Sequence, residues 1–177
     1  MRDAMTNKRI AVFCVGNRLH LDDGVGPAVY DAVMADVELP PHVDIFDVGV
    51  LTMDMINFVD DYDVIITVDA IEHSGEKPGT VLRGSPSDLA AAQGPNMSLH
   101  DLRLVDLFDA AALLGYEAEG ICLGMQVENT QPEILTEDLT PAVKEALPLL
   151  VDALLAELNV VPPVLTNGRS GRHCGSS

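Results

Sequence analysis

Hydrophobic residues along this chain occur in two patterns, short continuous runs and longer stretches with helical spacing. Residues 9–16 (RIAVFCVG) form a continuous apolar run, which is typical of a strand buried on both faces. Residues 25–37 follow with apolar side chains at helical spacing, and Pro27 suits the first turn of that helix. The same patterns predict further strands over residues 43–48, 63–69, 79–83 and 120–127, and further helices over residues 52–59, 98–114 and 140–158.

The order of these elements predicts an α/β fold in one domain. Because strands alternate with helices, we expect a mainly parallel sheet covered on both sides. Residues 79–83 suit a short edge strand, and residues 84–97, with two Pro and two Gly, are interpreted as a loop. Pro148 falls inside the last helix and should kink it. Residues 160–177 lack periodicity, so the domain is expected to span residues 1–159, followed by a flexible tail.

Composition indicates a globular domain with an aliphatic core. The chain has 177 residues, of which 47% are apolar and 21% are charged, a balance typical of a folded protein. Aromatic residues make up only 4% of the chain, and Trp is absent. The core is therefore expected to consist mainly of Val, Leu, Ile, Ala and Met.

The charge balance narrows the classes of partner. Twenty-eight Asp and Glu against ten Lys and Arg give a formal net charge of −18. Such a surface repels nucleic acids and anionic membranes, and it favours a metal ion or a protein with a positive patch. The three cysteines form no CxxC pair and no disulfide framework, and no segment has the pattern of a signal peptide or a membrane span. We therefore expect a soluble, cytoplasmic protein.

Candidate chemistry lies where the predicted strands end. Ligands of open α/β sheets bind beyond the carboxyl ends of the strands. After the first strand, residues 16–26 carry Asp22 and Asp23 just before a helix. Either carboxylate can simply cap that helix, where the dipole favours negative charge, and this alternative weighs equally with a functional role. A dinucleotide site fits poorly, because the loop lacks a second glycine and its carboxylates would repel a pyrophosphate.

Two further residues have side chains suited to metal binding. Asp69 ends an otherwise apolar strand, and His100 lies in the first turn of a predicted helix. Each also has an ordinary explanation, Asp69 as a loop carboxylate that caps nearby amides and His100 as a surface or packing histidine. A helix N-terminus keeps an imidazole neutral, which is the form that binds metal. Two carboxylates and one histidine would suit a transition metal with open positions, although their spacing alone does not show that they converge.

Common hydrolase motifs are absent from the chain. It has no G-x-S-x-G elbow and no H-E-x-x-H, and neither Cys14 nor Cys122, which are expected to be buried, has a histidine partner that is evident in the sequence. His20, His42 and His73 remain as further histidines. Because His73 follows Asp69 closely, it is a possible neighbour of the same site.

An ordered set of motifs resembles the nickel–iron hydrogenase maturation endopeptidases. The most specific is G-N-x-L-x-x-D-D-G-x-G-P over residues 16–27, directly after an apolar strand. The similarity continues in order through Asp47, residues 65–70 (IITVDA), residues 78–80 (PGT), residues 98–100 (SLH), Gly124 with Gln126, and residues 139–141 (LTP). The resemblance covers about residues 9–158, which is nearly the whole predicted domain.

The resemblance implies a fold, a set of site residues and a reaction. The fold is a three-layer α/β/α sandwich of the phosphorylase/hydrolase-like type, with a twisted, mostly parallel sheet. Asp23, Asp69 and His100 match the nickel-binding trio of the family, with Asp23 and Asp69 as catalytic carboxylates and with Asn17 and Asp22 as possible neighbours. The implied substrate is the precursor of a hydrogenase large subunit, whose C-terminal extension is removed after nickel insertion. The nickel is expected to belong to the precursor, and the protease to hold no tight metal of its own.

The chain departs from the usual family sequence at two places, and other functions remain open. Residues 47–49 are Asp-Val-Gly where the family usually has Asp-Gly-Gly, and residues 18–20 are more polar than is common. One alternative is a nickel-binding or precursor-binding maturation chaperone without peptidase activity. Others are a small-ligand-binding module in which the three residues only cap loops, and a protease of related fold such as the spore germination proteases.

Overall fold

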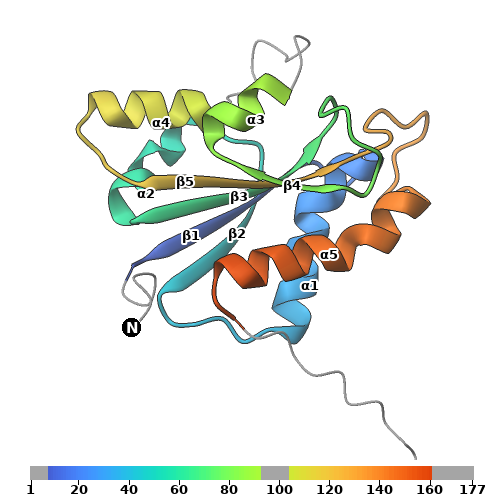
Figure 1. Ribbon diagram of the computed structural model, residues 1–177, viewed down its shortest axis with the longest axis horizontal. Coiled ribbons are helices and arrows are strands. Elements are labelled where there is room, and N and C mark those ends of the chain that lie inside the picture. The colour runs from blue at the N-terminus through green and yellow to red at the C-terminus, as the bar shows by residue number, and fades with distance from the viewer. Residues whose placement is uncertain (1–7, 93–103, 161–177) are drawn as a thin grey trace, which may run out of the picture.

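A twisted five-stranded sheet forms the centre of the protein (Figure 1). The computed structural model describes residues 8–92 and 104–160. The strand order is β2-β1-β3-β5-β4, with four parallel strands and an antiparallel β4 at one edge. The strands are β1 (Ile10–Val15), β2 (Val43–Gly49), β3 (Val64–Ile71), β4 (Val81–Gly84) and β5 (Glu119–Gln126). The predicted mainly parallel sheet and its short edge strand are confirmed.

Helices cover both faces of the sheet, as Figure 1 shows. They are α1 (Val25–Asp36), α2 (Ile56–Asp61), α3 (Pro86–Ala92), α4 (Leu104–Leu113) and α5 (Pro141–Glu157), and short 3-10 turns η1 (Leu21–Gly24) and η2 (Met53–Met55) precede α1 and α2. α1 and α5 pack together on one face, whereas α2, α3 and α4 lie on the other. This arrangement is the three-layer α/β/α sandwich that the resemblance implied.

The position of β1 explains why its sequence is an unbroken apolar run. All six of its residues are buried. Ile10, Val12 and Cys14 pack into the core cluster beneath α1 and α5, whereas Ala11 and Phe13 pack into the cluster beneath α2 and α4. A strand with helices on both faces needs an apolar side chain at every position.

The expected aliphatic core is confirmed on one face of the sheet, but the other face contains the phenylalanines. All four of them pack there: Phe13, Phe46, Phe58 and Phe108. The ring centroids of Phe13 and Phe58 are 5.5 Å apart, and those of Phe46 and Phe58 are 5.4 Å apart, in edge-to-face geometries that aromatic pairs favour. The few aromatic residues therefore concentrate in the core between the sheet and α2, α3 and α4.

One predicted loop is wrong, because part of residues 84–97 forms helix α3. The amide of Ser85 donates to Asp88 Oδ2 at 2.8 Å, and the amide of Asp88 donates to Ser85 Oγ at 3.2 Å. This reciprocal pair is a capping box, and Pro86 suits the first helical position that follows Ser85. The two Pro and two Gly of this segment suggested a loop, but one of those prolines helps to start a helix.

The remaining predicted elements agree with the structure wherever it describes them. The described part of the helix predicted over residues 98–114 is α4, and its predicted start lies outside the described residues. α5 continues through Pro148 to Glu157, and the kink predicted at that proline stays a prediction. Residues 161–177, most of the predicted tail, also lie outside the described residues.

Candidate active site

The carboxyl ends of the parallel strands meet at one edge of the sheet, where the sequence placed the site. One cavity there is lined by Gly16 after β1, by Gly49 at the end of β2, and by Glu72 after β3. β5 contributes Cys122 and Leu123 from inside the strand. Residues at or after the ends of three of the strands therefore line one cavity, whereas β5 contributes residues from within the strand and not the segment after it.

A tight turn after β1 brings Asp23 to this cavity. Gly16 has a φ of 135°, and a Cβ at this position would lie 1.9 Å from the backbone oxygen of Asp23. Only glycine tolerates both the conformation and the close approach. The Asn17 amide donates to Asp23 Oδ2 at 2.8 Å, and the Asp23 amide donates to the carbonyl of His20 at 3.1 Å. Asp23 consequently lines the cavity from a loop of fixed shape.

The adjacent carboxylate, Asp22, has different surroundings. It is fully buried and accepts hydrogen bonds from the backbone amides of Glu128, Asn129 and Thr140 at 2.7–3.1 Å. The Thr140 hydroxyl also donates to it. The N-cap of α1 is Gly24, and the hydrogen bonds of Asp22 go to residues 128–140, so the helix-capping alternative is wrong for Asp22. Asp22 instead ties the first loop to the segment between β5 and α5.

Asp69 lies on β3, two residues before the strand ends at Ile71, and not at the end of the strand as predicted. It is partly buried, and its Oδ1 accepts the amide of Ala70 at 2.7 Å. Burial, reinforced by the negative charge of Asp23, raises the pKa of Asp69 to about 8. Asp69 is therefore mainly a neutral carboxylic acid at pH 7, and the electrostatic effect of Asp23 shows that the two groups interact.

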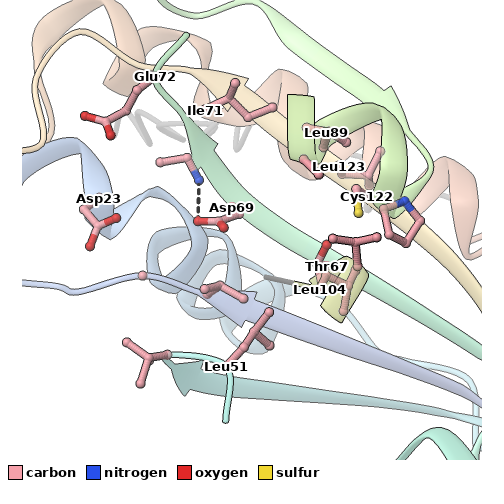
Figure 2. A pocket seen from close by; sticks show the side chains of 18 residues that line it. Asp23, Leu51, Thr67, Asp69, Ile71, Glu72, Leu89, Leu104, Cys122 and Leu123 are labelled. Atoms are coloured by element: carbon pink, nitrogen blue, oxygen red, sulfur yellow. Dashed lines mark hydrogen bonds between the residues drawn. The ribbon is translucent and has the colours of Figure 1, made fainter. Parts of the chain in front are cut away.

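The two carboxyl groups share a cavity of about 250 Å³, shown in Figure 2. Asp23 and Glu72 lie toward one end of it, and Asp69 lies between that end and the rest. The opposite end is lined by the side chains of Thr67, Leu89, Leu104 and Cys122. The cavity thus has an acidic end and a mainly apolar end, with Asp69 at the transition.

The structure brings together two of the three predicted nickel ligands. Asp23 and Asp69 line the same cavity, whereas His100 lies outside the described residues. Within residues 8–92 and 104–160, no three His, Cys, Asp or Glu side chains are grouped so that they could hold a metal ion. Two carboxylates still fit part of a divalent-metal site, because carboxylate oxygens are common ligands of such ions. Nickel ligation by the complete trio stays a prediction.

The other predicted neighbours lie around the site in different ways. Asn17 acts through its backbone amide on Asp23, and its side-chain oxygen accepts the amide of Leu19 at 3.0 Å. His73 is exposed and does not line the cavity. His20 is also exposed and forms a backbone bridge to Thr136. Asn17 is therefore the neighbour that shapes the loop around Asp23.

Arg18, in the polar stretch over residues 18–20, forms an ion-pair cluster beside the loop. Arg18 Nη1 lies 2.5 Å from Asp31 Oδ2 on α1, and Arg18 Nη2 lies 2.6 Å from Asp47 Oδ2 on β2. The Arg18 guanidinium holds the pKa of Asp31 below its usual value. Arg18 thereby links the first loop to the end of β2, which also borders the cavity.

Sequence reasoning missed Glu72 and the apolar end of the cavity. Glu72 follows β3 directly, and its Oε1 accepts the hydroxyl of Thr130 at 2.5 Å. Its position just beyond the carboxyl end of a strand was the available signal. The apolar end had no such signal, because Leu89 belongs to the unpredicted helix α3 and resembles any other core residue in sequence.

The arrangement is suited to acid–base chemistry at a bond held in the cavity. A neutral carboxylic acid beside a second carboxyl group can donate a proton while its partner accepts one. The same oxygens can serve as ligands for a divalent ion once Asp69 loses its proton, because metal ligation requires the ionised form. The site therefore offers a pair of carboxyl groups whose protonation depends on what the cavity holds.

Comparison with known proteins assigns the chain to a family. A family model described as hydrogenase maturation protease matches residues 27–157. The hydrogenase 2 maturation protease of Escherichia coli (strain K12) is 30% identical over 151 residues, which span 85% of this chain and 90% of that protein. The hydrogenase expression/formation protein HupD of Rhodobacter capsulatus is 26% identical over 166 residues, covering 93% of this chain and 78% of that protein.

Solved structures agree with this assignment. The hydrogenase maturating endopeptidase HybD from E. coli superposes with a TM-score of 0.75 at 28% identity, covering 85% of this chain and 92% of that one. The [NiFe] hydrogenase maturation protease HycI from Thermococcus kodakarensis KOD1 gives a TM-score of 0.66 at 25% identity, with coverage of 88% and 96%. With the fold and the position of the acidic cavity already described, these matches show that the chain belongs to the hydrogenase maturation proteases and is a peptidase.

Proposed function

We propose that this protease removes the C-terminal extension from a nickel-loaded large-subunit precursor of a [NiFe] hydrogenase. The observation that carries the proposal is the pair Asp23 and Asp69, which line one cavity at the carboxyl edge of the sheet. Membership of the hydrogenase maturation proteases supports the class of substrate. The removal of a C-terminal extension and the requirement for nickel are the proposed parts.

In this proposal, the protease recognises nickel that the precursor already carries. Asp23, Asp69 and His100 supply ligands to that ion, and the precursor fills the other positions. Asp69, whose pKa lies at about 8, gives up its proton when it ligates the nickel. The nickel-loaded precursor therefore changes the charge of the carboxyl pair, whereas a nickel-free precursor leaves Asp69 protonated. Cleavage then takes place only after nickel has been inserted into the precursor.

The attacking water has two possible activators in this arrangement, the nickel ion or one of the carboxylates acting as general base. Both lead to attack on a peptide carbonyl held beside Asp23 and Asp69. In either case a carboxylate of the pair takes up the proton that the water loses and passes it to the leaving amine, as carboxyl groups do in aspartic-type peptidases.

The net charge and the cysteines support the proposed surroundings of the reaction. A net charge of −18 favours a precursor with a basic surface near its processing site. The thiols of Cys14 and Cys122 are free and buried, which fits the reducing environment of the cytoplasm, where we place the reaction. Among the described residues, no helix combines the length and the apolar character needed to cross a bilayer.

Mixing the protein with a purified large-subunit precursor, with and without nickel, tests the proposal. We expect mass spectrometry to show loss of a C-terminal peptide from the nickel-loaded precursor only. Binding of the precursor without any loss of mass would instead support a maturation chaperone and would contradict the proposal.

A matched pair of histidine variants tests the third ligand. His100→Ala should abolish processing of the nickel-loaded precursor, because one of three nickel ligands is lost. His73→Ala is the control, because His73 is exposed and outside the cavity, and it should process the precursor at the wild-type rate. Equal rates for both variants would remove His100 from the site.

A further inference from the structure

The apolar end of the cavity has no role in the chemistry proposed so far. Its walls come from three elements beside the carboxyl pair: Leu89 and Ala90 of α3, Leu104 and Val105 of α4, and Cys122 of β5. Figure 2 shows Leu89, Leu104 and Cys122 at this end, with Asp69 between them and Asp23. None of these side chains has a role in the nickel ligation or the proton transfer proposed above, so their place beside the site needs another explanation.

The size of the cavity fits one large side chain and its adjoining backbone. Its volume is about 250 Å³. An apolar protein cavity of roughly 150 Å³ is large enough to hold a benzene molecule. A hollow of this size, with apolar walls at one end, favours an aliphatic group over water, because removing apolar surface from water is favourable.

The cavity is continuous from the carboxyl pair to the apolar walls, because Asp23, Asp69, Leu89 and Val105 all line it. A peptide whose scissile bond lies beside Asp23 and Asp69 can place a neighbouring side chain within it. Toward Glu72, that side chain would meet negative charge. Toward α3 and α4, it would meet apolar walls, which complement an aliphatic residue.

We propose that the apolar end is a specificity subsite for an aliphatic side chain of the precursor, contributed by a residue next to the scissile bond. This inference rests on the proposed function, because it places the scissile bond at Asp23 and Asp69. It adds a sequence requirement to the requirement for nickel. The protease then selects its substrate by two independent features, the metal that the precursor carries and the side chain beside the cut.

Filling the subsite provides the direct test. Ala90→Leu adds three carbon atoms to a half-buried position on the wall of the cavity. Ala35→Leu is the matched control, because Ala35 is an exposed residue of α1 on the opposite face of the sheet. Val105→Ala changes the same wall but enlarges the subsite instead of filling it, so the preference for Leu should persist in this variant. Circular dichroism establishes that each variant is folded.

Each enzyme is then mixed with nickel-loaded precursors in which the residues flanking the cut are replaced singly by Leu, Ala or Asp. With the wild-type enzyme and with Ala35→Leu, we expect one position at which Leu is processed at least tenfold faster than Asp. Ala90→Leu should lose the preference for Leu over Ala at that position, and Val105→Ala should retain it. The inference is overturned if no position discriminates, or if Ala90→Leu keeps the wild-type preference.

A binding measurement separates failure of the subsite from failure of the proposed function. N-acetyl-leucinamide, added at millimolar concentration, should shift the methyl NMR signals of Leu89 and Val105 saturably in the wild type and in Ala35→Leu, but not in Ala90→Leu. N-acetyl-glutaminamide is the polar control and should leave these signals in place. If no precursor is cut but these shifts occur, the proposed function fails while the apolar site stands. If cleavage occurs without shifts and without a side-chain preference, the subsite fails alone.

Discussion

At the residue scale, burial separates Asp22 from Asp23, which are neighbours in sequence. Asp22 is fully buried and accepts hydrogen bonds from three backbone amides and one hydroxyl, all of them more than 100 residues away in the chain. Asp23 lines the cavity and raises the pKa of Asp69. The first is a structural carboxylate, and the second is available for chemistry.

Asp22→Asn should therefore destabilise the protein. The amide group of Asn cannot accept all of these hydrogen bonds, and buried amides would lose their acceptor. We expect a loss of about 2–4 kcal/mol in the free energy of unfolding, measured by urea denaturation. Asp36→Asn, at an exposed position of α1, is the control and should change stability by less than about 0.5 kcal/mol. A stability equal to wild type in Asp22→Asn would show that these hydrogen bonds contribute little.

Asp69 should make the stability of the metal-free protein depend on pH. Its pKa is about 8 in the folded protein against 3.8 ordinarily, so the folded state keeps a proton that the unfolded state loses. The stabilisation from this group is fully present below about pH 4 and is lost as the pH rises toward about 8. Each unit of difference in pKa corresponds to about 1.4 kcal/mol. We therefore expect the free energy of unfolding to fall by an amount on the order of 3 kcal/mol or more between about pH 4 and pH 8.

Asp69→Asn removes the titrating group and tests this prediction. With a chelator present, the unfolding free energy of the wild type should fall relative to that of Asp69→Asn between pH 4 and pH 8. Asp36→Asn should follow the wild-type profile, because that position is exposed. Parallel profiles for wild type and Asp69→Asn would mean that Asp69 is ionised at neutral pH, and the proposed proton release on nickel binding would be wrong.

The residues of the site were predictable to different degrees. Asp23 was predicted from its place after the first strand and from the resemblance over residues 16–27, and Asp69 from its place near the end of a strand and from the resemblance over residues 65–70. The role of Asp22 could not be predicted from the sequence, because its partners Asn129 and Thr140 come close to it only in the tertiary fold. Sequence proximity cannot reveal hydrogen bonds between segments so far apart in the chain.

At the element scale, the contact between α1 and the sheet depends on a glycine in the first turn of the helix. A Cβ on Gly26 would lie 2.1 Å from the carbonyl oxygen of Val15 and 2.7 Å from that of Val68. Both obstacles are backbone atoms of β1 and β3, which cannot rotate away. The helix that follows the loop of Asp23 therefore packs directly on the strands that carry the site.

Gly26→Ala should move α1 away from the sheet and cost about 3 kcal/mol or more in unfolding free energy, because buried backbone has to shift. The control is Ala35→Gly, an exposed change in the same helix, which should cost only about 1 kcal/mol through helix propensity. Urea denaturation of both variants gives the comparison. A Gly26→Ala variant as stable as wild type would show that α1 can shift relative to the sheet at no cost in unfolding free energy.

The elements themselves were largely readable from hydrophobic patterning. Strands buried on both faces, such as β1, give unbroken apolar runs, and α1 and α5 show helical spacing in the sequence. α3 was missed because its start depends on the capping box of Ser85 and Asp88 around Pro86, in a segment where proline and glycine suggested a loop. The apolar end of the cavity was missed with it, since α3 supplies part of that wall.

At the scale of the whole molecule, charge is the dominant property. A net charge of −18 on 177 residues should attract a basic region of the precursor toward the acidic cavity. Attraction of this kind acts on association and is screened by salt, with a Debye length of about 10 Å at 0.1 M and about 3 Å at 1 M.

The processing rate should accordingly depend on ionic strength. We expect kcat/KM for the nickel-loaded precursor to fall roughly tenfold between about 0.05 M and 0.5 M NaCl, because salt weakens the attraction during encounter. At saturating precursor, kcat serves as the internal control and should change less than about twofold. If kcat/KM is insensitive to salt, the acidic surface does not steer the substrate.

The most direct test of the central claim is the mass of a nickel-loaded precursor after incubation with wild type, Asp23→Asn or Asp69→Asn. Asp36→Asn and nickel-free precursor complete the comparison. If Asp23 and Asp69 bind the nickel of the precursor and catalyse its cleavage, wild type and Asp36→Asn should remove the C-terminal peptide from the nickel-loaded precursor alone. Asp23→Asn and Asp69→Asn should be slower by at least about 100-fold. Wild-type rates in both of these variants, or equal cutting of nickel-free precursor, would contradict the account.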